Sequence, residues 1–141
     1  MNHQRRSIQR IRTFLLAEAS AFVIAALVHV GLLAEGYEHH DAVVFESILG
    51  SILFLGYLGA GVYPTWARHT GIAVQGVALF GTVIGRFSVI AGEGPWTILE
   101  LVFYRVITAV LIWGFITAII APTSNALASM PQDGEADKAR E

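Results

Sequence analysis

Four long apolar runs, separated by short polar breaks, constrain this chain more than any other feature. An α-helix needs about 20 mostly apolar residues to cross the hydrocarbon core of a bilayer, and each of the four runs reaches that length. We expect spans at about residues 13–34, 42–63, 70–92 and 97–121. Charged residues occur only singly within them, whereas the helices of a soluble bundle carry a continuous polar face. The sequence therefore predicts an all-α membrane protein, a compact four-helix transmembrane bundle over residues 13–121.

The two flanking segments predict the orientation of this bundle. Residues 1–12 contain four arginines and form an expected basic tail, and residues 122–141 form a polar tail that we expect to be disordered. The break between the first and second spans contains acids and histidines but no Lys or Arg. Because cytoplasmic segments carry the excess of Lys and Arg, we expect a multi-pass protein of the cell inner membrane with both termini in the cytoplasm. The first run is too long for a signal-peptide core, so it predicts a membrane anchor.

Composition excludes several classes of function. A net charge of −2, with nine Lys and Arg against eleven Asp and Glu, argues against a nucleic-acid partner. The absence of cysteine excludes disulfides, thiolate metal sites and iron–sulfur clusters. A bis-His haem is disfavoured because His29 is the single histidine well inside a span. The chain also has no GxSxG, P-loop or HExxH motif, which favours a non-enzymatic protein.

Small residues at four-residue spacing predict close packing of the spans, since lipid supplies no hydrophobic force between helices. The third span contains a GxxxG motif, Gly81 to Gly85. We expect this motif to serve packing within the bundle at least as well as dimerisation. The motif does not identify a partner; the partners that we expect are the lipid bilayer and either further copies in a homo-oligomer or a larger membrane complex.

Ionisable residues inside the spans are the main functional hypotheses, because such groups are costly in hydrocarbon. Eleven residues make about three helical turns, so side chains at that spacing share a face. Three pairs have this spacing: Glu18 with His29, Glu46 with Tyr57, and Gln75 with Arg86. They predict two polar layers about 16 Å apart, with a dry apolar stretch between them. The expected outer layer contains His29, Glu46, Arg86, Glu100 and Tyr104, and the inner layer contains Glu18, Tyr57 and Gln75.

The outer layer has two interpretations. Imidazoles and carboxylates together are ligands for divalent metal ions. A metal site open to the outside would use His29, Glu46 and one of His39 or His40, with Glu100 completing the set. In the favoured interpretation Arg86 pairs with Glu46 or Glu100 while His29 forms a hydrogen bond with a neighbour, because buried charges are most simply kept by pairing.

Three functions follow in order of preference. The first is a membrane protein whose outer cluster binds a small ligand or metal ion, or docks a larger membrane complex. The alternative is a proton-coupled small transporter that works as a homodimer, with Glu18 as the proton site unless Tyr57 or Gln75 merely caps it. The third is a membrane enzyme that uses the outer histidine and acids around a metal ion.

Overall fold

The computed structural model describes residues 2–88 and 97–122, which form helices joined by short connections. The elements are α1 (Asn2–His29), α2 (His40–Val62), the 3₁₀ helix η1 (Pro64–Trp66), α3 (Ala67–Ser88) and α4 (Ile98–Ile120). No strand occurs in these two ranges. The four α-helices are all long and apolar enough to cross a membrane. The expected all-α architecture with four candidate membrane spans is therefore confirmed.

The first helix differs most from its expected bounds. It begins at Asn2, so the basic segment is the start of α1, and it ends at His29 rather than near residue 34. Ile11 and Leu15 of this helix are 1% and 0% exposed, which places its early turns inside the bundle. Since apolar residues recur at three- and four-residue steps while the early arginines face outward, this segment is amphipathic. The end of the expected third span and the tail after residue 122 lie outside the described residues.

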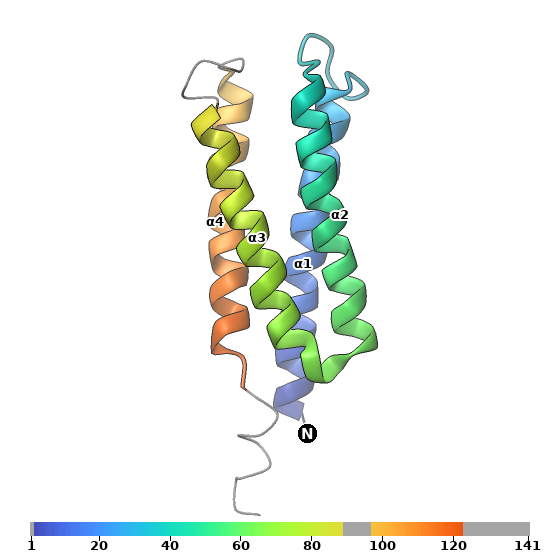
Figure 1. The fold of residues 1–141 in the computed structure, drawn as a ribbon, viewed down its shortest axis with the longest axis vertical. Coiled ribbons are helices and arrows are strands. Elements are labelled where there is room, and N and C mark those ends of the chain that lie inside the picture. Colours follow the sequence, from blue (N-terminus) through green and yellow to red (C-terminus); the bar gives the residue numbers. More distant parts are fainter. Residues whose placement is uncertain (1, 89–96, 123–141) are drawn as a thin grey trace, which may run out of the picture.

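The helices run alternately in opposite directions, as Figure 1 shows. The connection from α1 to α2 and the start of α4 lie at one end of the bundle, which we call the loop end. The start of α1, η1 and the end of α4 lie at the other, which we call the terminal end. Helix α1 packs against the other three α-helices, and α3 also contacts α2 and α4. All four helices contribute residues to the buried centre of the bundle.

Glycines allow the close approach of helices within this single bundle. A β-carbon at Gly50 of α2 would lie 3.3 Å from Phe22 Cβ of α1. A β-carbon at Gly81 or Gly85 of α3 would lie 3.3 Å or 3.2 Å from the ring of Phe45 in α2. Both glycines of the GxxxG motif therefore face α2, which agrees with packing inside the bundle.

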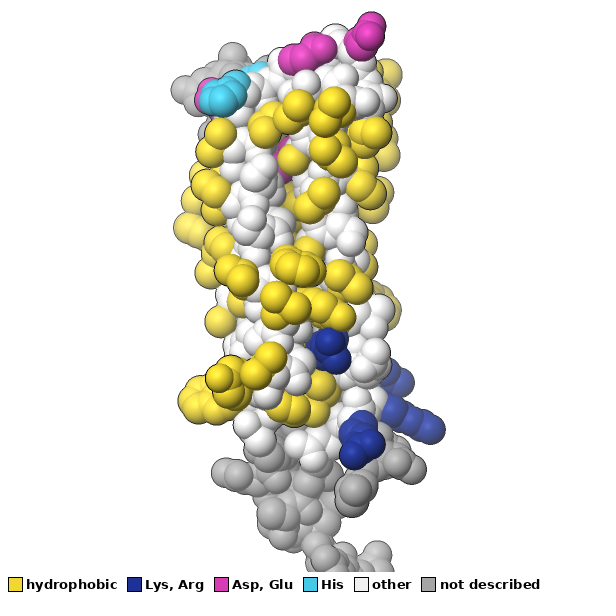
Figure 2. Space-filling view, turned by 90° about the vertical axis from the view of Figure 1, so that its right-hand side faces the viewer, with side chains coloured by type: hydrophobic (Ala, Val, Ile, Leu, Met, Phe, Trp, Pro, Cys, Tyr) yellow, Lys and Arg dark blue, Asp and Glu magenta, His cyan; other side chains and the backbone are white. Residues whose placement is uncertain are grey.

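Apolar side chains form a belt around the middle of the face seen in Figure 2, with acids and histidine at the loop end and arginines at the terminal end. Many large apolar side chains on the outside of the bundle are strongly exposed, including Phe80 and Trp113 at 69% each. Water would make such a surface unstable, whereas lipid tails solvate it. We call this surface the apolar belt.

Candidate functional site

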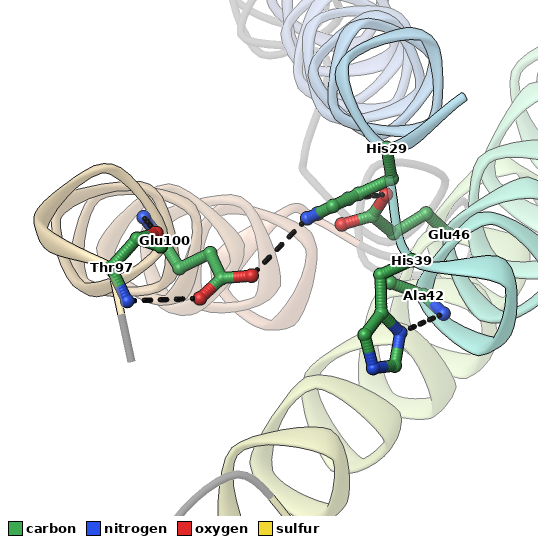
Figure 3. A network of polar contacts seen from close by, with 6 residues as sticks. All are labelled: His29, His39, Ala42, Glu46, Thr97 and Glu100. Carbon is green, nitrogen blue, oxygen red and sulfur yellow. Dashed lines mark hydrogen bonds and ion pairs between the residues drawn. The ribbon is translucent and has the colours of Figure 1, made fainter. Parts of the chain in front are cut away.

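The loop end of the bundle contains a buried cluster of three ionisable side chains from three helices, His29 of α1, Glu46 of α2 and Glu100 of α4. The Nδ1 atom of His29 lies 2.8 Å from Glu46 Oε2, and its Nε2 atom lies 3.3 Å from Glu100 Oε1. Figure 3 shows the two carboxyl groups approaching the imidazole from different sides. The three side chains are 6%, 1% and 12% exposed. We call these residues the His29 cluster.

Local structure at two helix starts positions this cluster. Thr97 and Glu100 form a capping box, in which Thr97 Oγ1 accepts from Glu100 N and Glu100 Oε2 accepts from Thr97 N, both at 3.2 Å. One oxygen of Glu100 therefore caps α4 while the other faces the imidazole. His39 caps α2 by accepting a hydrogen bond from Ala42 N at 3.3 Å, and its own N–H donates to the carbonyl of His29 at 3.0 Å. The start of α4 is thus attached to the end of α1 through the contact of Glu100 with His29, and the start of α2 through the bond of His39 to the His29 carbonyl.

The geometry of the His29 cluster sets its proton content. A neutral imidazole has one donor and one acceptor nitrogen, and an ionised carboxylate can only accept. Both ring nitrogens of His29 face carboxyl oxygens, so either the imidazole is protonated or one of Glu46 and Glu100 is. A neutral imidazole with two ionised carboxylates lacks a donor for one of the two contacts. The three groups therefore share at least one additional proton. With this one proton the cluster carries a net charge of −1, and with a second proton it is neutral.

Two other predicted members of the outer layer do not join this network. Arg86 forms no ion pair with Glu46 or Glu100 in the part of the chain that the structure describes. The expectation that Arg86 neutralises these acids is therefore wrong, because His29 occupies the position between them. Tyr104 lies on α4 one turn below Glu100 and is half-buried, and its hydroxyl forms no hydrogen bond with any described residue.

The four predicted metal ligands, His29, His39, His40 and Glu46, do not come together around one point. Nδ1 of His39 is used in capping α2, and His40 is exposed at the start of that helix. The two nitrogens of His29 lie on opposite edges of the ring, so they cannot both ligate one ion. Among the side chains that the structure describes, no group of three or more His, Asp or Glu is placed to hold a metal ion.

A pocket of about 130 Å³ adjoins the His29 cluster between α1 and α4. Its polar lining residues include His29 and Glu100, and Tyr37 from the connection after α1 covers one side. The remaining walls are apolar. Two wall residues, Ile24 and Leu99, are 56% and 47% exposed, so the pocket opens at the apolar belt. The pocket can hold a small apolar molecule next to His29 and Glu100, whereas Glu46 does not line it.

The connection that carries Tyr37 is organised by the carboxylate of Glu38. Both of its oxygens accept from Gly36 N, at 3.2 and 3.0 Å. Hydrogen bonds from backbone N–H groups, its own and that of Gly36, hold the pKa of Glu38 below its ordinary value. Gly31 and Gly36 have φ of +84° and +87°, a conformation that glycine adopts readily, so the chain can turn tightly here. A β-carbon at Gly31 would also lie 2.9 Å from Glu38 Oε1.

A second buried polar group lies nearer the terminal end. Gln75 Nε2 of α3 donates to both carboxyl oxygens of Glu18 of α1, at 3.0 and 3.1 Å, and both side chains are 0% exposed. We call them the Glu18–Gln75 pair. Gly114 of α4 closes the third side, since a β-carbon there would collide with both Glu18 Oε1 and Gln75 Nε2. Tyr57, also predicted in this layer, instead lies beneath the guanidinium of Arg12, whose Cζ is 4.6 Å from the ring centre.

Gly114 is the functional-site residue that sequence reasoning missed. It is the single glycine between Ile98 and Ile120, in a helix otherwise rich in large apolar side chains. A lone glycine in such a helix predicts that a group from another helix comes close to it. The sequence therefore contained a pattern from which the position of Gly114 could have been predicted.

Comparison with known proteins assigns no role to these residues. No protein-family model, curated protein or solved structure matches the chain. The His29 cluster and the Glu18–Gln75 pair are therefore the features of the molecule from which a function can be inferred.

Proposed function

We propose that this chain is a multi-pass protein of the cell inner membrane, with both termini in the cytoplasm, that binds a small ligand at its loop end. The arginines of α1 at the terminal end support this orientation, because basic residues accumulate on the cytoplasmic side. The connection between α1 and α2 would then face outward. The ligand site is the pocket between α1 and α4 together with the His29 cluster.

One observation carries this proposal. The buried Oε1 atom of Glu46 has no hydrogen-bond partner among the described residues, although it belongs to a cluster of ionisable groups. A buried acceptor without a partner costs about 1–3 kcal/mol, and more when it is charged. Ionic groups kept only for stability are expected to satisfy one another fully. A cluster that keeps an unpartnered buried oxygen, next to a pocket that His29 and Glu100 line, is better explained by a ligand held at this end of the bundle.

The proposal is tested by NMR of the histidine side chains in lipid nanodiscs. The chain has five histidines, so ¹⁵N-imidazole labelling gives few signals, and the signal lost in His29→Gln identifies His29. Benzyl alcohol and benzylammonium serve as probes because each carries one polar group on a compact ring. We expect at least one of them to shift the His29 signal saturably. A probe that merely dissolves in the lipid leaves that signal unchanged.

A matched pair of variants locates the binding. Val28 lines the pocket, so Val28→Phe is expected to fill it and abolish the saturable shift. Val23 lies on the same helix, is 52% exposed and does not line the pocket, so Val23→Phe is expected to bind as the parent does. Equal effects of the two variants, or no shift with either probe, would contradict the proposed site.

A second candidate function, a proton-coupled small transporter acting as a homodimer, is favoured by the Glu18–Gln75 pair. Glu18 is fully buried and no basic side chain among the described residues forms an ion pair with it. The amide of Gln75 can donate to a carboxylate and, after turning, accept from a carboxylic acid, so it can serve Glu18 in both states.

The transporter candidate is tested in proteoliposomes that contain a pH-sensitive dye. A gradient of benzyltrimethylammonium, which cannot cross lipid as a neutral base, is imposed and proton movement is recorded. Transport should disappear in Glu18→Gln and persist in Ser20→Ala, whose side chain is exposed on the same helix. Unchanged proton movement in Glu18→Gln, or none in the parent protein, would remove this candidate.

A further inference from the structure

We propose that the terminal end of the bundle binds the phosphate group of an anionic phospholipid in a second pocket, where Arg68 pairs with it. This pocket lies where the start of α1, the 3₁₀ helix η1, the start of α3 and the end of α4 meet. We call it the terminal pocket. It is separate from the pocket beside the His29 cluster, so the inference goes beyond the proposed function and does not depend on it.

The charge of Arg68, which lines the terminal pocket, is the first step. A guanidinium group stays protonated in proteins, so this charge is fixed. Its Nη2 atom donates to the carbonyl of Ile119 at 3.1 Å, which uses one of its five N–H donors. Arg68 forms no ion pair with a described acid, and its buried Nε atom has no hydrogen-bond partner among the described residues. The positive charge of Arg68 therefore has no counterion in the described part of the protein.

The surroundings of the terminal pocket add further positive charge. Arg5, Arg6 and Arg10 are exposed on the first turns of α1, which also carry the pocket residue Ser7. Figure 2 shows arginines at the terminal end and acids at the loop end of the bundle. Every described acid lies at the loop end except Glu18, which is fully buried. The local field therefore attracts an anion and disfavours a cationic group.

Hydrogen-bond donors and size define the group that fits the terminal pocket. The hydroxyls of Ser7 and Thr65 and the amide of Gln4 line it together with Arg68. A phosphate group accepts hydrogen bonds from donors of these types, and arginine binds phosphate especially well. The pocket has a volume of about 40 Å³, whereas one water molecule needs about 10–15 Å³ and benzene about 150 Å³. The oxygens of a phosphate group therefore fit, and the ring of a sugar or a nucleotide base does not.

The position of the pocket favours a lipid as the source of the phosphate. It lies at the ends of three candidate membrane spans, those of α1, α3 and α4. Tyr63 and Trp66, next to the pocket residues of η1, are 64% and 65% exposed. Such aromatic side chains at the ends of membrane spans lie at the level of the lipid headgroups. A lipid phosphate can therefore reach the pocket while its acyl chains lie along the apolar belt.

The experiment titrates three probes into the protein in dodecylmaltoside micelles at constant pH. The readout is the ¹⁵N-imidazole signal of His69, which lines the terminal pocket and is identified by its loss in His69→Gln. The probes are phosphatidylglycerol, phosphatidylethanolamine with the same acyl chains, and inorganic phosphate. We expect saturable binding of phosphatidylglycerol, about fivefold or more tightly than phosphatidylethanolamine, whose ammonium group meets the surrounding arginines. Inorganic phosphate should bind more weakly than phosphatidylglycerol because it has no acyl chains.

A matched pair of variants tests the role of Arg68. Arg68→Gln and Arg10→Gln each remove one positive charge from the terminal end, but Arg10 is exposed and does not line the pocket. We expect Arg68→Gln to weaken the binding of phosphatidylglycerol about tenfold or more, because a hydrogen-bonded charge pair is lost. Arg10→Gln should change it by about twofold or less. Equal losses in the two variants would overturn the assignment and indicate attraction to the surface as a whole.

A second pair of variants keeps the test decisive if Arg68→Gln folds poorly through loss of its bond to Ile119. Ser7→Leu fills the terminal pocket and leaves Arg68 in place, so it is expected to abolish the saturable shift. Gln9→Leu lies on the same helix, is exposed and does not line the pocket, so it should bind as the parent does.

The remaining outcomes distinguish the sources of the phosphate. Inorganic phosphate that binds as tightly as phosphatidylglycerol would overturn the lipid assignment and leave a site for a soluble phosphate. Equal binding of the two phospholipids would overturn the preference for an anionic headgroup. No saturable shift of the His69 signal with any probe would overturn the inference as a whole, and it would leave the proposed site at the loop end untouched.

Discussion

Replacing Gly114 by alanine is expected to separate the Glu18–Gln75 pair. A β-carbon at this position would collide with polar atoms of both side chains, one on α1 and the other on α3. Neither partner has free space, since each is 0% exposed. The added methyl group therefore either pushes α4 outward or breaks the hydrogen bonds that Gln75 donates to Glu18.

The size of the effect can be worked from these contacts. Overpacking of a tight interior costs about 1–3 kcal/mol, and a buried polar group left without its partner costs about 1–3 kcal/mol. Alanine returns about 1 kcal/mol of helix propensity relative to glycine. The expected net loss in the free energy of unfolding is roughly 3 kcal/mol.

Gly59→Ala is the matched control, because a β-carbon there would lie 3.9 Å from its nearest neighbour, Thr70 Cγ2. This variant should be as stable as the parent or slightly more stable. Unfolding is followed by tryptophan fluorescence during titration with sodium dodecyl sulfate in dodecylmaltoside micelles. In a background that carries Glu18→Ala and Gln75→Ala, most of the loss caused by Gly114→Ala should disappear. Equal stability of Gly114→Ala and Gly59→Ala would refute the reasoning.

Three further predictions concern the loop end and the helix contacts. Thr97→Ala should lower the free energy of unfolding by about 1 kcal/mol because the N-terminal cap of α4 is lost, whereas Thr97→Ser should not, as chemical unfolding will show. Gly85→Leu should destabilise the fold by about 1–3 kcal/mol through its contact with Phe45, and an unchanged midpoint of unfolding would contradict that contact. Because the pKa of Glu38 is lowered by folding, the ionised Glu38 carboxylate stabilises the connection between α1 and α2. This stabilisation is complete above the pKa of Glu38 in the unfolded chain, and it is lost as the pH falls through the pKa in the folded protein. Hydrogen exchange at Gly36 N should therefore lose protection on acidification, and in Glu38→Gln it should be weak at every pH.

Local patterns in the sequence were sufficient to predict the four apolar helices and the buried face of α1. Backbone polar groups in lipid must be satisfied within each helix, so a long apolar run predicts its structure without knowledge of its neighbours. The eleven-residue spacing of Glu18 and His29 predicted one shared face, and both side chains are buried. The start of α1 was expected too late, because the arginines among its first residues resemble a tail although Ile11 lies in the core.

The sequence by itself determined an all-helical chain with four candidate membrane spans, and it singled out the ionisable residues that such spans rarely carry. Only the tertiary structure decided the partners of those residues: His29 lies between two acids, Arg86 pairs with neither, and Gly114 closes the Glu18–Gln75 pair. The physical reason is the distance along the chain over which each interaction acts. Helix formation depends on bonds between residues four apart, whereas a hydrogen bond between side chains depends on the rotation and depth of two helices to within about 1 Å.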